Sequence, residues 1–300
     1  MRPAPIALSG QARADARPKP PPRPSYEALR VFARNPSALA GVLLLAAILA
    51  VTIFGPMVMQ ADPFEIAAAP MEPPGGELLL GSDYLGRDVL TGMIYGGRAT
   101  LLVGVVAAVL SMAIGITVGA LAGYYGGWVD ETLMRITEFF QVLPTLLFAM
   151  VLVTLFSPSL ATIAVAIGVV SWTGTARLAR GEFLRLKRRE YVLAERVIGA
   201  GDARIIWRVI LPNALAPLIV SATLAIGTAI LFEAGLSFLG LGDPNVMSWG
   251  LMIGSNRPYI LTAWWAVTLP GAAIFLTVLA VSLIGDGLND ALNPTSRGRA

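Results

Sequence analysis

The sequence predicts an all-α integral membrane protein with six transmembrane helices. Hydrophobic residues make up 56% of the 300-residue chain and charged residues only 14%, against about 25% charged in soluble domains. Several uncharged apolar runs reach the roughly 20 residues that a helix needs to cross a bilayer. The chain contains no cysteine and no histidine. Disulfides, thiolate or imidazole metal sites and Cys- or His-based catalysis are therefore excluded, and we expect neither a metal site nor a catalytic residue.

Residues 1–35 precede the first apolar run and are expected on the cytoplasmic side. Residues 1–24 are rich in Pro, Arg and Ala, a composition that cannot bury a core and is typical of a disordered or polyproline-like arm. Residues 26–35 carry two arginines and predict a short amphipathic helix on the membrane surface. The following apolar run starts too late and is too long for a cleavable signal peptide.

The predicted domain boundaries follow the apolar runs. They are a first transmembrane helix at 36–60, an extracytoplasmic Pro/Gly-rich loop at 61–98, a core of five transmembrane helices at 99–294 and a cytoplasmic tail at 295–300. The apolar segments that predict the six spans lie at 38–59, 99–129, 139–176 (two antiparallel helices joined by a tight turn at 157–159), 209–232 and 263–285.

Small residues recur every four positions along the second span, which predicts a face for close helix packing. The residues are Ala107, Ser111, Gly115, Gly119, Gly123 and Gly127. Tight packing within the chain is the main interpretation, and a sliding contact with another subunit is the functional alternative.

Basic residues predict the orientation of the chain. Lys and Arg collect in the N-terminal arm, at 177–208 and in the C-terminal tail, which six spans place on one side of the membrane. Only Arg87, Arg98 and Arg257 fall on the other side. The positive-inside rule then makes the basic side cytoplasmic, with both termini there. In isolation the basic run at 185–189 resembles a nucleic-acid patch, but beside a membrane span it favours a topology signal near anionic headgroups.

Residues 190–213 form a polar, basic segment between two long apolar runs. Tyr191, Ala194, Glu195 and Ile198 fall at i, i+3, i+4 and i+7, which predicts a mildly apolar, small-featured helical face. The glycines at 199–201 should break this helix. Asp202 is then expected to cap a second helix at 203–211, closed by Pro212 at the mouth of the next span. A helix-turn-helix of this kind on the membrane surface can dock into a groove of another protein.

This segment resembles the EAA loop of bacterial ABC-importer permeases, whose pattern is E-A-A, three residues, G, nine residues and I-x-L-P. Matching positions are Ala194, Gly199, Leu211 and Pro212, with Val209 in place of the isoleucine. Leu193 and Glu195 depart from the pattern. The resemblance implies contact with a cytoplasmic ATPase, and an ordinary interfacial helix is the alternative. The residues it implicates in coupling are Tyr191, Ala194, Glu195, Ile198, Gly199, Val209, Leu211 and Pro212.

Other segments resemble the C-type permease of the dipeptide/oligopeptide/nickel family. They read G-S-D-Y-L-G-R-D-V-L-T-G-M-I-Y-G-G-R at 81–98, F-E-A-G-L-S-F-L-G-L-G at 232–242, S-W-G at 248–250, and G-D-G-L followed by D-A-L-N-P within 285–294. The run at 81–88 nearly matches a phosphate-binding loop. We reject a nucleotide site there, because Arg87 and Asp88 replace the required Lys and Ser/Thr, and the run is expected outside the cell.

Four ionisable residues are candidates for the outer loop or a gate. Asp83, Arg87 and Asp88 are expected to pair with one another in a local turn or with a docking partner. Glu233 is the one acid at the end of a long apolar run, about 30 Å along its helix and so near the outer face of the bilayer. It is expected to line the substrate path or its gate, or to tie the outer loop by a hydrogen bond at the helix end.

The resemblance implies a type I ABC importer permease in the bacterial inner membrane. The chain would form a heterodimer with a second homologous permease and would bind two cytoplasmic ATPase subunits and an extracytoplasmic solute-binding protein. ATP and Mg would belong to the ATPases, so the chain itself would be non-catalytic, with no cofactor and no nucleic acid. The implied cargo is di- or oligopeptides, with nickel complexes or another small solute as the alternative. A secondary transporter is disfavoured, because the spans are nearly free of charge and show no clear repeat.

Overall fold

The computed structural model describes residues 24–76 and 78–292, a part of the chain that is helical and without β-strands. Four of its helices are long and apolar enough to cross a membrane, and two bent helix pairs raise the number to six when each pair counts as one span. The predicted all-α architecture with six spans is confirmed. The predictions for the N-terminal arm up to residue 23 and for the tail at 295–300 fall outside the described residues.

The first two helices are separated by one capping residue. α1 (Pro24–Arg34) lies where the surface helix was predicted, and α2 (Pro36–Met59) is the first span. The Asn35 side chain accepts hydrogen bonds from two amides of the first turn of α2, and this N-cap accounts for the break. Its amide nitrogen also donates to Asp290 at 3.2 Å, which joins the start of α2 to the end of the last helix, α12 (Trp265–Leu292).

The second span is longer at its N-terminal end than the sequence predicted. α3 (Val89–Tyr125) begins at Val89, so the predicted start at residue 99 is wrong and the loop at 61–98 is shorter than expected. The prediction stopped at Arg98, the first charge met on that side. The helix continues past it to Asp88, whose carboxylate accepts hydrogen bonds from two amides of the first turn and so fixes the helix start.

The third span is broken near its middle. α4 (Gly127–Val142) and α5 (Thr145–Phe156) meet at an angle of 87°. Pro144 stands in the break, where its missing amide N–H and its ring oppose a continuous helix. The span therefore starts at Gly127, well before the uncharged run at 139–176 that predicted it. That run marked only the apolar part of a longer, partly polar helix.

The fourth span is also bent, by 45°, between α6 (Leu160–Ser171) and α7 (Thr173–Leu186). The turn predicted at 157–159 is present. Ser159 caps α6 by accepting a hydrogen bond from the amide of Thr162.

A short helix, α8 (Glu190–Val197), follows the fourth span, and the chain then turns back into a long helical stretch. This stretch consists of α9 (Asp202–Arg204), the π-helix η1 (Ile205–Ile210), α10 (Leu211–Leu236) and a second π-helix, η2 (Ser237–Leu241).

The predicted helix-turn-helix is present, but its second helix differs from the prediction in two respects. Gly201, not Asp202, is the N-cap, and Asp202 is the first helical residue. Pro212 does not close the unit, since the helix that starts at Asp202 runs on through it into α10, and the residues just before it form the π-helix η1. The fifth span therefore extends beyond the predicted 209–232 at both ends.

Between η2 and α12 the chain folds back on the bundle through α11 (Trp249–Asn256) and the short 3-10 helix η3 (Arg257–Tyr259). The Ser248 hydroxyl caps α11, and the Trp249 indole donates to a backbone carbonyl of α3 at 2.8 Å. The sixth span, α12, reaches Leu292 and so ends seven residues after the predicted end at 285.

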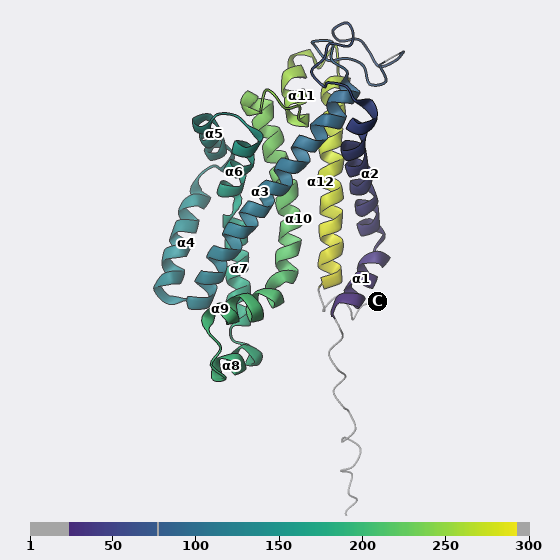
Figure 1. Cartoon of the computed structure of the whole chain (residues 1–300). Helices are drawn as coiled ribbons and strands as arrows, with labels where there is room; N and C mark the ends of the chain where they lie inside the picture. Colours follow the sequence, from purple (N-terminus) through teal and green to yellow (C-terminus); the bar gives the residue numbers. More distant parts are fainter. Residues whose placement is uncertain (1–23, 77, 293–300) are drawn as a thin grey trace, which may run out of the picture.

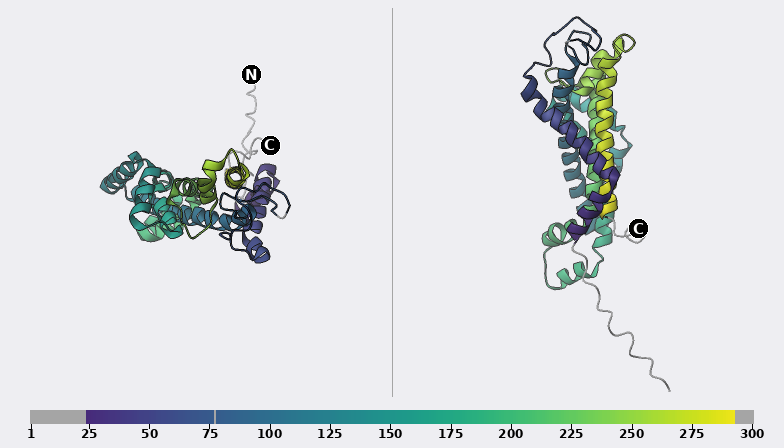
Figure 2. Two further views of the ribbon diagram at one scale, coloured as in Figure 1. Left: turned by 90° about the horizontal axis from the view of Figure 1, so that it is seen from above. Right: turned by 90° about the vertical axis from the view of Figure 1, so that its right-hand side faces the viewer.

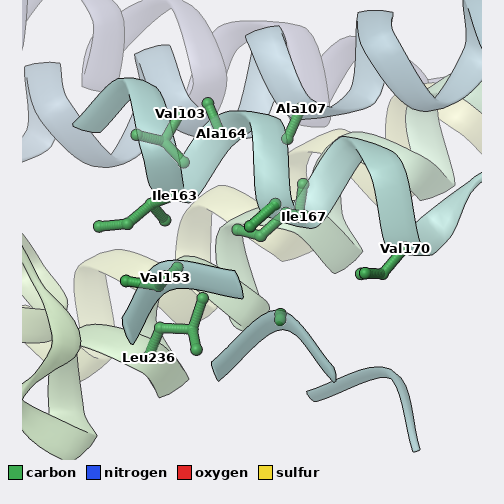
Figure 3. Close-up of a cluster of buried hydrophobic side chains, with 11 residues drawn as sticks. Val103, Ala107, Val153, Ile163, Ala164, Ile167, Val170 and Leu236 are labelled. Carbon is green, nitrogen blue, oxygen red and sulfur yellow. The ribbon is translucent and has the colours of Figure 1, made fainter. Parts of the chain in front are cut away.

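Side chains from four helices form one of the buried clusters of the bundle (Figure 3). Its labelled members are Val103 and Ala107 of α3, Val153 of α5, Ile163, Ala164, Ile167 and Val170 of α6, and Leu236 of α10. Many other large apolar side chains of the spans are exposed in the isolated chain, as expected of helices that face lipid or another subunit.

The helices run roughly parallel in an elongated bundle, with α2 and α12 at one edge and α4 at the other (Figures 1 and 2). α1, α8 and the end of α12 lie at one end of the bundle, while α11 and the loop before α3 lie at the opposite end. α8 extends furthest beyond the ends of the long helices (Figure 1). The described parts of the basic segments that the sequence assigned to one side of a membrane, at 24–34 and 177–208, thus lie toward one end.

Candidate functional site

The helix α8 carries an exposed apolar surface at the end of the bundle. Val192 points inward and is fully buried. Val197 is 87% exposed and Ile198 75% exposed, and Tyr191 and Leu193 are also more than a third exposed. An apolar surface on a short helix outside the spans is typical of a binding site for another protein. Tyr191 and Ile198 were predicted for this surface, whereas Leu193 and Val197 were not.

Two hydrogen bonds close the turn that follows α8. Gly199 has a φ of 84°, a left-handed conformation that glycine adopts without strain. Its amide donates to the Arg196 carbonyl at 3.0 Å, and the Ala200 amide donates to the Glu195 carbonyl at the same distance. A Cβ at Gly199 would meet no atom within 4 Å. The turn therefore requires glycine for its backbone angle and not for lack of space.

The remaining predicted coupling residues lie around this turn or beyond it. Ala194 is exposed on α8, and the Glu195 carboxylate lies 3.7 Å from Arg204 across the turn. Val209 belongs to η1, and Leu211 and Pro212 begin α10. Val209 and Leu211 are half-buried and pack against the cluster that contains Val192, whereas Pro212 is exposed, and none of the three lies on α8.

Tyr124, at the end of α3, fastens both arms of the turn and was not predicted from the sequence. Its hydroxyl donates to the Asp202 carboxylate at 2.6 Å, and the Arg196 guanidinium lies 5.2 Å from its ring centre, within the range of a cation–π interaction. Tyr124 itself is 5% exposed. Arg196 belongs to α8 and Asp202 to α9, so one side chain of α3 holds the residues on either side of the Gly199 turn.

A second contact joins α3 to the end of α7. The Lys187 ammonium donates to the carbonyls of Gly123 at 2.8 Å and Tyr124 at 3.3 Å. These carbonyls belong to the last turn of α3, where a cation is favoured by the helix dipole. Burial, and then the neighbouring charge of Arg188, lower the pKa of the Lys187 side chain. A cavity of about 720 Å³ opens beside this contact, between α3 and α8.

The predicted glycine face brings the backbones of α3 and α7 into contact. A Cβ at Gly115 would lie 2.6 Å from the Thr175 side chain, one at Gly119 would lie 2.2 Å from the Ala176 carbonyl oxygen, and one at Gly123 would lie 2.7 Å from the Arg180 carbonyl oxygen. Only glycine permits this separation. Gly127 was expected to continue the face but instead begins α4, with a φ of 54°.

The bidentate ion pair between Arg180 and Asp130 ties α4 to α7 on the same side of the bundle. The guanidinium Nη2 lies 2.7 Å from one carboxylate oxygen, and Nε contacts the other. This geometry is the strongest form of a charge-assisted contact. Together with Tyr124 and Lys187, it links α3, α4, α7 and α8 at one end of the molecule.

At the opposite end, Asp83, Arg87 and Asp88 do not pair with one another, which was one of the two predicted alternatives, and a contact with a docking partner stays a prediction. Asp83 accepts hydrogen bonds from the amides of Leu85 and Arg87, both at 2.8 Å, and Asp88 caps α3. The Arg87 guanidinium lies 5.1 Å from the Phe64 ring centre. Among the described residues Arg87 has no ion pair, so the expected salt-bridged turn is wrong. The carboxylates of Asp83 and Asp88 both accept hydrogen bonds from backbone amides.

Glu233 is fully buried near the C-terminal end of α10. The Ser237 hydroxyl, one turn further on, donates to its carboxylate at 2.8 Å. The other carboxylate oxygen is buried and has no hydrogen-bond partner among the described residues. The hydrogen bond to Ser237 fits the predicted tie at the helix end, and the alternative role, lining the substrate path or its gate, stays a prediction.

Residues 115–298 match the family described as the binding-protein-dependent transport system inner membrane component. Residues 24–74 match the N-terminal TM domain of oligopeptide transport permease C. Among the described helices, the first match begins inside α3 and covers the coupling segment.

Curated relatives align over nearly the whole chain. The di/tripeptide transport system permease protein DppC of Pseudomonas aeruginosa is 42% identical over 287 residues, covering 93% of this chain and 95% of the relative. The dipeptide transport system permease protein DppC of Escherichia coli is 43% identical, covering 91% of this chain and 94% of the relative. The oligopeptide transport system permease protein OppC of Bacillus subtilis is 36% identical, covering 90% of this chain and 90% of the relative. A solved structure of the MetNI methionine ABC transporter, in an inward-facing conformation, has a TM-score of 0.57 at 21% identity, covering 67% of this chain and 96% of that one.

Proposed function

The chain belongs to the family of binding-protein-dependent transport system inner membrane components, and from this premise we propose that it is a permease subunit that imports di- or oligopeptides. It is a multi-pass membrane protein of the ABC importer class. The peptide cargo is supported by relatives named for dipeptide, di/tripeptide and oligopeptide transport that align over about nine-tenths of the chain or more. Nickel complexes and other small solutes have no comparable observation in their favour.

The complex that we propose has one further permease, two cytoplasmic ATPase subunits and an extracytoplasmic binding protein. ATP and Mg bind the ATPases, and this chain contributes no catalytic residue. The end of the bundle that carries α1 and α8 faces the cytoplasm, in line with the distribution of lysine and arginine. The loop before α3 and α11 then face the binding protein.

The observation that carries the coupling role is the exposed apolar surface of α8 on a turn fastened to α3. A groove of an ATPase covers Tyr191, Val197 and Ile198 in this account. Closure of the two ATPases on ATP displaces α8. Because Tyr124 holds both arms of the turn and the glycine face keeps α3 against α7, this displacement is passed to the spans as a rigid movement and not absorbed at the turn.

Reconstitution tests this function. The chain, its partner permease, the ATPases and the binding protein would be placed in proteoliposomes, and uptake of a labelled dipeptide would be measured with and without ATP. We expect uptake only with ATP and only with the ATPases present. Uptake that is driven by an ion gradient without ATPases, or uptake of a nickel complex but no peptide, would overturn the proposal.

A further inference from the structure

The cavity of about 720 Å³ between α3 and α8 is lined by three cationic side chains, those of Lys187, Arg188 and Arg196. Of the described residues that line it, Asp202 is the only acidic one, and its carboxylate already accepts the hydrogen bond from Tyr124. The volume lies within the roughly 300–1,000 Å³ that is typical of small-molecule sites. We name this cavity the basic cavity.

None of the three cations has an ion pair with a described residue. The Lys187 ammonium donates to two neutral carbonyls, while Arg188 and Arg196 are exposed. Burial and then the neighbouring charge of Arg188 lower the pKa of Lys187, and Arg196 adds to this effect. The basic cavity therefore presents positive charge that no acid of the described chain offsets. Other arginines do have an acidic partner, in the pairs Arg135–Glu131, Arg180–Asp130, Arg185–Glu182 and Arg204–Glu195.

The basic cavity lies where two membrane-spanning helices end. α3 ends at Tyr125, and α7 ends at Leu186, directly before Lys187. Tyr125 lines the cavity and is 51% exposed, and tyrosine is enriched at the boundary between hydrocarbon and headgroups. This end of the bundle, which carries α8 (Figure 1), is the cytoplasmic one in the proposed function. The cavity then opens at the depth of the phosphate groups of the inner leaflet.

We propose that the basic cavity binds a phosphate group, supplied by the headgroup of an anionic phospholipid such as phosphatidylglycerol. Guanidinium groups match phosphate oxygens with paired N–H donors, and an ammonium adds a point charge. Basic pockets between membrane helices on the cytoplasmic side suit such headgroups. Inorganic phosphate has the same chemistry, but only the lipid is held at this depth by its acyl chains.

A bound headgroup would join the end of α7 to α8, because Arg188 follows α7 and Arg196 belongs to α8. It would thereby stabilise the Gly199 turn against α3. This inference takes only its orientation in the membrane from the proposed function, and it adds to that function a lipid ligand beside the coupling segment.

Arg188→Gln and Arg189→Gln test the site in the complete complex. Each variant removes one exposed positive charge, but Arg189 does not line the cavity and so provides the matched control. The complex in detergent would be titrated with phosphatidylglycerol, phosphatidylcholine or inorganic phosphate. The molecules that remain on this chain after its release from the complex would be counted by native mass spectrometry.

We expect the wild type to bind phosphatidylglycerol in preference to phosphatidylcholine. Its affinity for phosphatidylglycerol should fall about tenfold in Arg188→Gln, from one lost charge-assisted contact, and stay near the wild-type value in Arg189→Gln. Equal weakening in both variants would assign the binding to overall charge and overturn the site. Displacement of the lipid by an equal concentration of inorganic phosphate would overturn the lipid assignment. If the wild type shows no lipid preference and Arg188→Gln loses its ATPases, the cavity takes an acidic side chain of an ATPase, and the proposal is overturned.

Coupling gives the second readout. The complexes would be placed in phosphatidylcholine vesicles with and without phosphatidylglycerol, and ATPase stimulation by loaded binding protein would be measured. We expect phosphatidylglycerol to raise this stimulation several-fold in the wild type and in Arg189→Gln, but not in Arg188→Gln. An equal response in Arg188→Gln and the wild type would contradict the site. If the wild type imported no peptide in either vesicle, the proposed function would fail, whereas the lipid count would still decide on the basic cavity.

Discussion

Tyr124 of α3 donates a hydrogen bond of 2.6 Å to the carboxylate of Asp202, a residue 78 positions further along the chain. The guanidinium of Arg196 lies over the same aromatic ring, 5.2 Å from its centre. Since Arg196 and Asp202 flank the Gly199 turn, this single side chain fixes the turn against the end of a membrane-spanning helix. In the proposed mechanism it is the point at which movement of α8 enters the bundle.

Tyr124→Phe should weaken coupling without preventing assembly. The ring and its contact with Arg196 remain, but the Asp202 carboxylate loses its donor, a loss of about 1–3 kcal/mol for a charged acceptor. We expect the stimulation of ATPase activity by loaded binding protein to fall several-fold in proteoliposomes. Tyr125→Phe, on the neighbouring residue, which is 51% exposed, is the matched control. Equal stimulation in Tyr124→Phe and the wild type would show that the hydrogen bond has no part in coupling.

Gly119→Leu should separate α3 from α7. A Cβ there would lie 2.2 Å from the Ala176 carbonyl oxygen, a backbone atom that cannot rotate away, so the helices must move apart at a cost of about 1–3 kcal/mol or more. Thermal unfolding in detergent should show a lower midpoint and a loss of complex yield. Gly271→Ala in α12 is the control, because a Cβ there would meet no atom within 4 Å. A wild-type midpoint for Gly119→Leu would contradict the close packing.

Gly199→Val should disturb the turn but not the bundle. The φ of 84° is strained for a β-branched residue, at about 1–3 kcal/mol, while the space around the position is open. We expect normal membrane insertion and complex formation, with loss of both peptide uptake and ATPase stimulation. Gly201→Ala serves as control, since Gly201 has a φ of −70° and equally open surroundings. Normal uptake by Gly199→Val would count heavily against a docking role for α8.

Two substitutions of Glu233 distinguish a structural hydrogen bond from a negative charge that acts in transport. Glu233→Gln keeps an acceptor for the Ser237 hydroxyl, and we expect near-normal uptake and thermal stability. Glu233→Ala removes the acceptor and leaves a cavity, and should lower stability by about 2–4 kcal/mol. Unfolding midpoints and uptake rates would be measured for both variants. Loss of uptake in a fully stable Glu233→Gln complex would show that the negative charge itself is needed.

Most of the fold follows from the sequence because span formation depends mainly on apolar length. The boundaries do not, since capping residues set them. Asp88 starts α3 on the far side of Arg98, and Pro144 divides a span whose polar half, from Gly127, carries too many charges to be recognised as membranous. Pro212 was expected to end a helix, but the helix continues through it, and the residues just before it form the π-helix η1.

The candidate site was predictable in its local pattern and not in its long-range contacts. The spacing from Ala194 to Pro212 located the turn, and the positive φ of Gly199 follows from the need to reverse a helix. The partners of Asp202 and Arg196 could not be found in this way, because Tyr124 is remote in sequence. Its place in the last turn of the glycine face, next to Gly123, was the one available signal.

The central claim is that α8 docks on a nucleotide-hydrolysing subunit, and cross-linking at Ile198 tests it most directly. Ile198 is 75% exposed and the chain has no cysteine of its own, so Ile198→Cys provides a single reactive thiol for a short bifunctional reagent in the assembled complex. We expect a cross-link between Ile198→Cys and an ATPase subunit, and we expect the yield of this cross-link to change when ATP is added. A complex that imports peptide while Ile198→Cys cross-links to no ATPase would contradict it.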